Sequence, residues 1–395
     1  MRHSVKDVLA CLVLLCAAGM ASAAPYVPAS DAQILERLPF KPNDPIAREM
    51  SRMRAELQRN PHDVDAAVRL ASRYYGLVSE EGDPRYLGYA QAALAPWWDM
   101  PSPPIEVQVL RASLAQFRHD FDGALVDLTK VLERDPGHHQ ARLLRATIHI
   151  VQARYRDAKT DCNSLSSTPD DFIAIGCKAM VDGLTGRSAD AYQVLTAAFK
   201  NHPGAASNEK LWVLTRLAEI SQRQGRMDIA EVHFKQALAL GITDTFLLAA
   251  YSDFLLDQNR PAEVVTLLRD QTPSDGLLLR LVFAERALNL PAAKQRETTL
   301  AARFTAAQMR GDTVHQQEEA RFTLHVRNDP KNALMLAQEN WKVQREPRDA
   351  RIFLEAALAL KDTAAAKPVL QWLEDSHIED ALLISLARQL NGARK

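Results

Sequence analysis

The sequence is poor in aromatic residues and has almost no net charge. Aromatic side chains make up 6% of its 395 residues, and the formal net charge at pH 7 is −1. It also has no long run of basic residues, so neither the overall nor the local charge favours binding to nucleic acid or to an anionic lipid surface. After residue 23 no apolar stretch is long enough to span a membrane, and we expect no stable membrane insertion of the mature chain.

Motifs that would indicate catalysis or a bound cofactor are also absent. The chain has no glycine-rich phosphate loop, no nucleophile elbow and no paired Cys-x-x-Cys sequence. His315 and Glu319 are four residues apart and share one face of an expected helix, but this spacing is more typical of an ordinary charged helix surface than of a metal site. We therefore expect no enzyme activity, no cofactor and no metal ion.

The first 23 residues have the features of a cleaved export signal. Arg2 and Lys6 form a basic start, residues 8–20 are apolar, and a run of small residues ends at Ala23. The apolar run is too short for a membrane span. Lipidation at Cys16 is the alternative, but the two leucines before it do not match the small residue that such a site requires. We expect a periplasmic or secreted protein that is cleaved after Ala23.

The apolar residues are mostly alanine and leucine, which favours helices over strands, and the alanines form a repeat. Pairs of alanines recur twelve residues apart, at Ala112 and Ala124, Ala146 and Ala158, Ala179 and Ala191, and Ala218 and Ala230. Small side chains at these places would let the two helices of a hairpin approach closely. Intervals of 34, 33 and 39 residues separate the second alanines of successive pairs. This period indicates stacked helix–turn–helix units rather than separate globular domains.

Other marks of the repeat fall between and after the expected helices. A polar or conformationally permissive residue precedes each second helix, at His119, Ala153, Gly186 and Gly225. Three units end at a proline, at Pro136, Pro169 and Pro203. The pattern resembles the tetratricopeptide repeat, a helix–turn–helix unit of 34 residues. The resemblance implies an all-α, right-handed α-α superhelix of about eight or nine helix pairs, as in an exported bacterial member of this family.

The resemblance is strongest in the middle of the chain. Ser252 and Val264 stand where the family has alanines, and no unit has the family's early tryptophan. We expect a signal peptide at 1–23, an extended segment at 24–45, a capping helix with a first divergent repeat at 46–104, core repeats at 105–242, divergent repeats at 243–376, and a carboxy-terminal capping helix with a tail at 377–395.

The mature chain keeps two cysteines, Cys162 and Cys177. They fall on the second helix of one unit and the first helix of the next, which should be antiparallel neighbours, so a disulfide is geometrically allowed. Export to an oxidising compartment favours this bridge. The alternative is two buried thiols that pack as small apolar residues.

The first helices of such an array line its concave face, and this groove is the expected binding site. Its wall would be formed by Val109, Phe117, Leu143, Ile150, Val151, Ile173, Met180, Leu184, Glu219 and Arg223. Asp253 and Asp257 would continue its charged section. A largely apolar wall suits an amphipathic helix or an extended peptide.

These features predict an exported adaptor that binds protein or peptide segments in its groove, with a role in envelope assembly. One alternative is a structural scaffold that self-associates through its ends or through Trp97 and Trp98. Another is a non-catalytic accessory subunit of an envelope enzyme. The sequence predicts no particular oligomeric state.

Overall fold

The computed structural model describes residues 44–165, 171–271, 273–312 and 314–392. The expected signal peptide at 1–23 and the extended segment up to residue 43 lie outside these described residues. The chain divides into two compact units, residues 1–52 and 53–395. Helix α2 (Pro45–Arg59) runs across the boundary, and every other described helix belongs to the second unit. None of the described helices is both long and apolar enough to cross a membrane.

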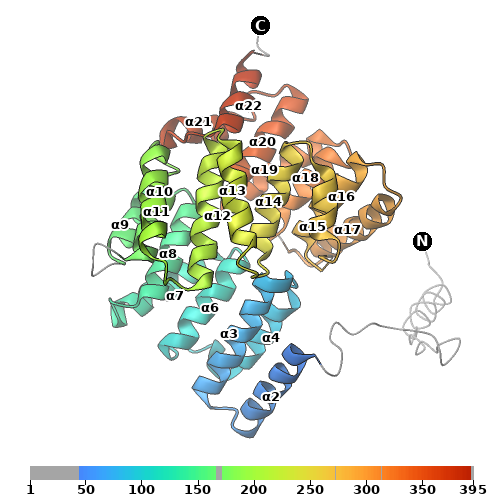
Figure 1. Ribbon diagram of the computed structural model, residues 1–395. Coiled ribbons are helices and arrows are strands. Elements are labelled where there is room, and N and C mark those ends of the chain that lie inside the picture. Colours follow the sequence, from blue (N-terminus) through green and yellow to red (C-terminus); the bar gives the residue numbers. More distant parts are fainter. Residues whose placement is uncertain (1–43, 166–170, 272, 313, 393–395) are drawn as a thin grey trace, which may run out of the picture. The chain divides into compact units, whose positions relative to one another are not determined.

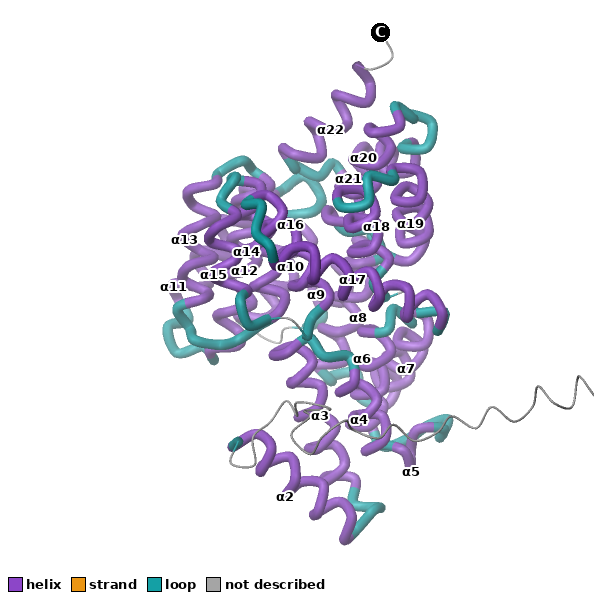
Figure 2. Tube along the Cα trace, turned by 90° about the vertical axis from the view of Figure 1, so that its right-hand side faces the viewer, coloured by secondary structure: helices purple, strands orange, loops and turns teal. Residues whose placement is uncertain are grey.

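The described part of the second unit contains helices and no strands (Figure 1, Figure 2). The helices form nine consecutive hairpins, in each of which the two helices pack against each other. The hairpins are α3 (Val64–Glu81) with α4 (Arg85–Ala93), α6 (Ile105–Phe117) with α7 (Phe121–Arg134), α8 (His139–Val151) with α9 (Tyr155–Asn163), α10 (Phe172–Asp182) with α11 (Ser188–Asn201), α12 (Ser207–Arg223) with α13 (Met227–Leu238), α14 (Thr245–Asp257) with α15 (Pro261–Leu268), α16 (Asp275–Ala287) with α17 (Ala292–Met309), α18 (Gln316–His325) with α19 (Pro330–Val343), and α20 (Pro347–Leu360) with α21 (Lys367–Ser376). The short α5 (Ala95–Trp98) follows the first hairpin, and α22 (Ala381–Gly392) follows the last.

The first helices of successive hairpins also pack side by side. Helix α3 contacts α6, and the same contact repeats from each first helix to the next as far as α18 and α20. We call this row the inner helix layer, and the second helices lie on its outer side. The fold is an all-α solenoid of tetratricopeptide-like helix pairs, as the sequence predicted.

The paired alanines lie where the hairpins pack most closely. All eight are at most 3% exposed. Ala112 on α6 and Ala124 on α7, for example, share a core with Phe121. A larger side chain at either place would hold the two helices apart. In the hairpin of α14 and α15 the corresponding Ser252 and Val264 are also fully buried, so this hairpin keeps its close contact without the alanines.

The turn of every hairpin holds one residue in the left-handed backbone conformation. The nine residues have φ between 53° and 75° and are Gly82, His119, Ala153, Gly186, Gly225, Asn259, Asn289, Asn328 and Lys361. Glycine adopts this conformation freely, whereas a residue with a Cβ is strained there. All four turn residues expected from the sequence belong to this set. The turn geometry therefore repeats even where glycine is absent.

We expect Ala153→Gly to raise the free energy of unfolding by about 1 kcal/mol, because glycine relieves the strain of a positive φ. The measurement is urea unfolding followed by circular dichroism. The control is Ala302→Gly, at an exposed position within α17, which should lower the same free energy by about 1 kcal/mol. A loss of stability in both variants would contradict a strained turn at Ala153.

The last hairpins pack back onto hairpins that lie much earlier in the sequence. Buried side chains of α8–α10 and of α18–α22 belong to one apolar core. The indole Nε1 of Trp372 donates a 3.2 Å hydrogen bond to the Tyr155 hydroxyl, and the Arg345 amide donates a 2.8 Å hydrogen bond to the Val151 carbonyl. We call this contact between α8–α11 and α18–α22 the closure seam.

Helix α22 lies within residues 377–395, where the sequence predicted a carboxy-terminal capping helix with a tail. Its Leu383, Leu386 and Leu390 are buried and belong to the core of the closure seam. Just before it, the Glu379 carboxylate accepts a 2.9 Å hydrogen bond from the amide of Ser188, at the start of α11. The end of the array is therefore covered by its own earlier repeats.

Cys162 and Cys177 form a disulfide that joins α9 to α10, with their Cα atoms 5.4 Å apart. Both are buried in the core of the closure seam. The bridge thus connects the second helix of one hairpin with the first helix of the next.

Reduction of this disulfide should lower the free energy of unfolding by about 3 kcal/mol, because the open chain gains conformational entropy when it unfolds. Urea unfolding with and without a phosphine reductant measures the difference. A variant with both cysteines replaced by alanine is the control and should not respond to the reductant. Alkylation of two free thiols in the unfolded, non-reduced protein, detected by mass, would show that no bridge forms.

Candidate functional site: a cavity enclosed by the inner helix layer

The closure seam makes the inner helix layer the wall of a cavity of about 540 Å³. Side chains from α8, α10, α12, α14, α16, α18 and α20 line it, together with the first residues of α13 and α22. All of these helices except α13 and α22 are first helices of hairpins. The volume lies within the range of roughly 300–1,000 Å³ that is usual for ligand pockets.

Five of the ten predicted groove residues meet in this cavity. They come from three successive first helices and their ends, and are Ile150, Met180, Leu184, Glu219 and Arg223. Asp253 and Asp257 line it as well. The seven residues lie within a stretch of little more than a hundred positions, and they form one side of the cavity.

The other five predicted groove residues do not line the cavity. Val109 is buried in the core of α6 and α7, and Val151 packs against that core. Leu143 packs against the core of the closure seam. Phe117 and Ile173 are half-buried outside the cavity lining. Val109, Val151 and Leu143 therefore stabilise contacts between helices.

The cavity lining also includes charged residues that were not among the predicted groove residues. It contains Arg280, Arg321, Glu346, Arg348, Arg351 and Glu355. They belong to α16, α18 and α20 or lie just before α20, in the region that the sequence showed only as divergent repeats. The sequence shows charged residues on these three successive first helices. Such charges are typical of a solvated helix face, and only the closure seam places them around a cavity.

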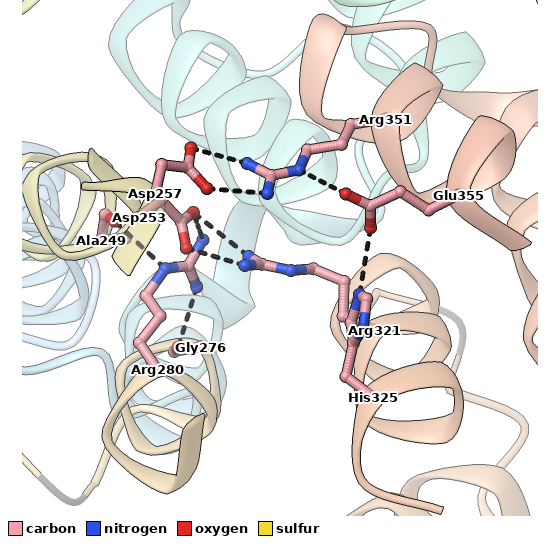
Figure 3. A network of polar contacts seen from close by, with 9 residues as sticks. All are labelled: Ala249, Asp253, Asp257, Gly276, Arg280, Arg321, His325, Arg351 and Glu355. Atoms are coloured by element: carbon pink, nitrogen blue, oxygen red, sulfur yellow. Dashed lines mark hydrogen bonds and ion pairs between the residues drawn. The ribbon is translucent and has the colours of Figure 1, made fainter. Parts of the chain in front are cut away.

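Asp253 on α14 holds three neighbouring first helices together (Figure 3). Arg280 on α16 donates to its carboxylate at 2.6 Å, and Arg321 on α18 donates to it at 2.8 Å. Arg280 is held in place by further hydrogen bonds to the carbonyls of Ala249 and Gly276. Burial raises the pKa of the Asp253 carboxyl, but the two arginines outweigh this effect and hold that pKa below its ordinary value of 3.8.

A second group of charges connects α14 to α20 and α18 (Figure 3). Both terminal nitrogens of the Arg351 guanidinium donate to Asp257 at 2.8 Å, and its Nε donates to Glu355 at 2.7 Å. The imidazole of His325 lies 3.0 Å from the same glutamate. Burial raises the pKa of Glu355, but these partners more than offset it and lower that pKa to about 2. The Glu355 carboxylate is therefore ionised at neutral pH.

Phe246 is the aromatic residue of the cavity lining, and two guanidinium groups lie against it. The Arg216 guanidinium carbon is 4.5 Å from the ring centroid and that of Arg348 is 5.6 Å away. Met180 and Leu184 add apolar surface to the same cavity. The lining is therefore mixed, with apolar areas between groups of paired charges.

Arg223, at the end of α12, has no carboxylate partner within the part of the chain that the structure describes. Its Nη2 donates a long, 3.5 Å hydrogen bond to the Gly183 carbonyl, and its Nε is buried without a partner. Burial lowers the pKa of the guanidinium, while the charges of Glu219 and Asp380 act in the opposite direction. One arginine of the cavity thus has a charge that no contact neutralises.

The described residues contain no group of three histidine, cysteine or acidic side chains that could hold a metal ion. His315 precedes α18 as its N-cap residue, and the buried Glu319 accepts a hydrogen bond from Gln308. The two residues with metal-like spacing therefore have separate structural contacts.

The sequence matches no protein-family model and no curated protein. Solved structures with a similar fold include a tetratricopeptide repeat protein from Parabacteroides merdae, which is 14% identical, with 65% of this chain and 90% of that chain covered and a TM-score of 0.43. The APC/C hetero-tetramer Cut9–Hcn1 is 15% identical, with 79% and 59% covered and a TM-score of 0.44. Yeast Tom70 is 10% identical, with 88% and 85% covered and a TM-score of 0.40.

At these identities the similarity concerns the fold alone. The chain's own hairpins make it a helical-repeat protein of the solenoid class. Its repeating unit is tetratricopeptide-like, with two antiparallel helices that meet at small residues and a turn of constant geometry.

We expect Asp253→Asn to lower the free energy of unfolding by about 3 kcal/mol at pH 7, because Arg280 and Arg321 would lose the carboxylate that both depend on. The difference in the free energy of unfolding between this variant and the unchanged protein should narrow as the pH falls below 3.8. A carboxyl with a depressed pKa stabilises the fold only while it is ionised, and this stabilisation is lost when it takes up a proton. Urea unfolding at pH 7 and at pH 3 measures both effects.

The control for this variant is Asp99→Asn, at an exposed position after α5, which should leave stability unchanged at both pH values. Equal stability of Asp253→Asn and Asp99→Asn at pH 7 would show that the contact among α14, α16 and α18 does not depend on the carboxylate.

Proposed function

We propose that this chain is an exported, non-catalytic adaptor that binds a short segment of another protein in its inner cavity. The mixed lining of the cavity supports this function, because apolar areas next to charged groups suit a peptide. The signal-like sequence at 1–23 supports a periplasmic or secreted location. Assembly of the cell envelope is the process in which an adaptor at this location would act.

The form of the bound segment follows from the same lining. Apolar areas between charged groups suit either an amphipathic helix or an extended peptide, the two forms expected from the sequence.

The alternative of self-association through Trp97 and Trp98 receives no support from their positions. Trp97 is 7% exposed and its ring lies edge-on to His62, with centroids 6.5 Å apart. Trp98 is half-buried. The pair therefore offers little exposed aromatic surface, and we do not propose this role.

Selection from an unbiased library of linear peptides, with the mature chain as bait, tests the proposed function. Substitution of Met180 by glutamate should raise the dissociation constants of the selected peptides at least tenfold, because this half-buried side chain lines the cavity. The matched control is Val194→Glu on the outer helix α11, where the side chain is 54% exposed and no loss is expected. Leu184 is unsuitable, because it is buried in the closure seam.

Fluorescence anisotropy with each labelled peptide gives the dissociation constants, and circular dichroism checks that both variants are folded. Failure to select any peptide, or equal affinities of Met180→Glu and Val194→Glu, would refute binding in the cavity.

A further inference from the structure

Within the described residues, the arginines of the cavity form ion pairs, with one exception. The arginines other than Arg223 all have a carboxylate partner: Arg216 has Glu219, Arg280 and Arg321 share Asp253, Arg348 has Glu346, and Arg351 has Asp257. Arg223 forms no ion pair within the described ranges of the chain. An uncompensated cation enclosed by protein is unfavourable, because it has lost water without gaining an anion.

The acidic groups near Arg223 are already engaged. Glu219 lies 2.7 Å from Arg216. Asp380 accepts a 3.0 Å hydrogen bond from the Leu383 amide at the start of α22, and burial raises the pKa of its carboxyl. Neither group is close enough to Arg223 for an ion pair. The positive charge therefore remains available to an anion that enters the cavity.

Gly183 provides the space in which the Arg223 guanidinium lies. A Cβ atom at this position would be 3.4 Å from the Arg223 Nη2 and 3.3 Å from Ile220. Any side chain there would therefore crowd the guanidinium. Arg223 thus occupies a fitted place on the cavity wall and shares the cavity with the apolar Met180 and Leu184.

We propose that the cavity binds an amphipathic anion, whose negatively charged group pairs with Arg223 and whose apolar part contacts Met180 and Leu184. This proposal rests on the proposed function in taking the cavity as the binding site, and it adds the chemistry of the ligand. A guanidinium pairs well with planar or tetrahedral oxyanions through two parallel hydrogen bonds. The anion is carried either by an acidic residue or chain end of the bound segment or by a free small molecule.

Two fluorescent probes separate the charge from the apolar contact. Anilinonaphthalene sulfonate is an amphipathic anion, and N-phenylnaphthylamine has the same rings without the sulfonate. The unchanged protein should bind one equivalent of the sulfonate at least tenfold more tightly than the neutral compound. Arg223→Met should remove this preference and leave the affinity for the neutral compound within about twofold.

The stability of the ligand-free variant provides a second readout. Arg223→Met replaces an unpaired, half-buried charge by an apolar side chain of similar length, so its thermal midpoint should equal or exceed that of the unchanged protein. Arg388→Met, at an exposed position on α22, is the control and should change neither probe affinity nor stability. A lower midpoint for Arg223→Met, or failure of this variant to fold, would show that Arg223 is structural and would overturn the proposal.

Arg348→Met tests which arginine of the cavity binds the sulfonate. Arg348 is 43% exposed and already paired with Glu346, so its substitution should leave the preference for the sulfonate unchanged. Loss of the sulfonate preference in Arg348→Met but not in Arg223→Met would also overturn the proposal.

The library peptides distinguish this inference from the proposed function. In one outcome, amides replace the acidic groups of a selected peptide without loss of affinity, and the protein shows no preference for the sulfonate. This outcome would support peptide binding and contradict the anion site. In the other outcome, no peptide binds but the sulfonate binds through Arg223, which would support an anion site for a free small molecule and contradict the adaptor function.

Discussion

Close approach of helices at small residues is the constraint on which this structure depends. Ala112 and Ala124, and the equivalent pairs in the next three hairpins, are buried where two backbones meet. The two helices of each hairpin therefore lie close together, and the first helices of successive hairpins pack in one continuous layer. Larger side chains would separate the helices and interrupt this layer. The cavity exists because the layer is continuous and returns to its own earlier part at the closure seam.

The closure seam changes the surroundings of the charged residues on the inner helix layer. Side chains that would be fully hydrated on an open concave face lie close together and are partly shielded from water, so that an unpaired charge is costly. Asp253 forms ion pairs with two arginines from different helices, and Arg351 forms ion pairs with two carboxylates. These contacts fix the relative positions of α14, α16, α18 and α20. Because Arg223 lies outside this pairing, it is the group through which the cavity can respond to a ligand.

Local features of the fold could be predicted from the sequence. The alanine spacing and the turn residues are set by contacts within one hairpin, so they repeat visibly along the chain. His119 and Ala153 were recognised as turn positions although neither is glycine, and both have positive φ. The repeats after residue 243 departed further from the family pattern, because residues such as Ser252 and Val264 fulfil the same packing role with different chemistry.

The closure seam could not be predicted in this way. Its hydrogen bonds join residues 191 and 217 positions apart, such as Ser188 with Glu379 and Tyr155 with Trp372. The small rotations between successive repeats accumulate over several hairpins, and no single repeat encodes their sum. For this reason the sequence identified one side of the cavity and missed the other. It also assigned Val109 to an open groove although that side chain fills the contact between two helices.

The seam also has a consequence for how the molecule folds. In a linear array each repeat contacts only its neighbours, so folding can begin anywhere and spread, and the ends can fray independently. Here the final hairpins complete a core that begins at α8. The contacts of highest sequence separation therefore form only after the intervening repeats are in place, which slows the last step of folding. Once formed, they join α8–α11 and α18–α22 into one cooperative unit, so that the cavity and the repeats around it are lost together.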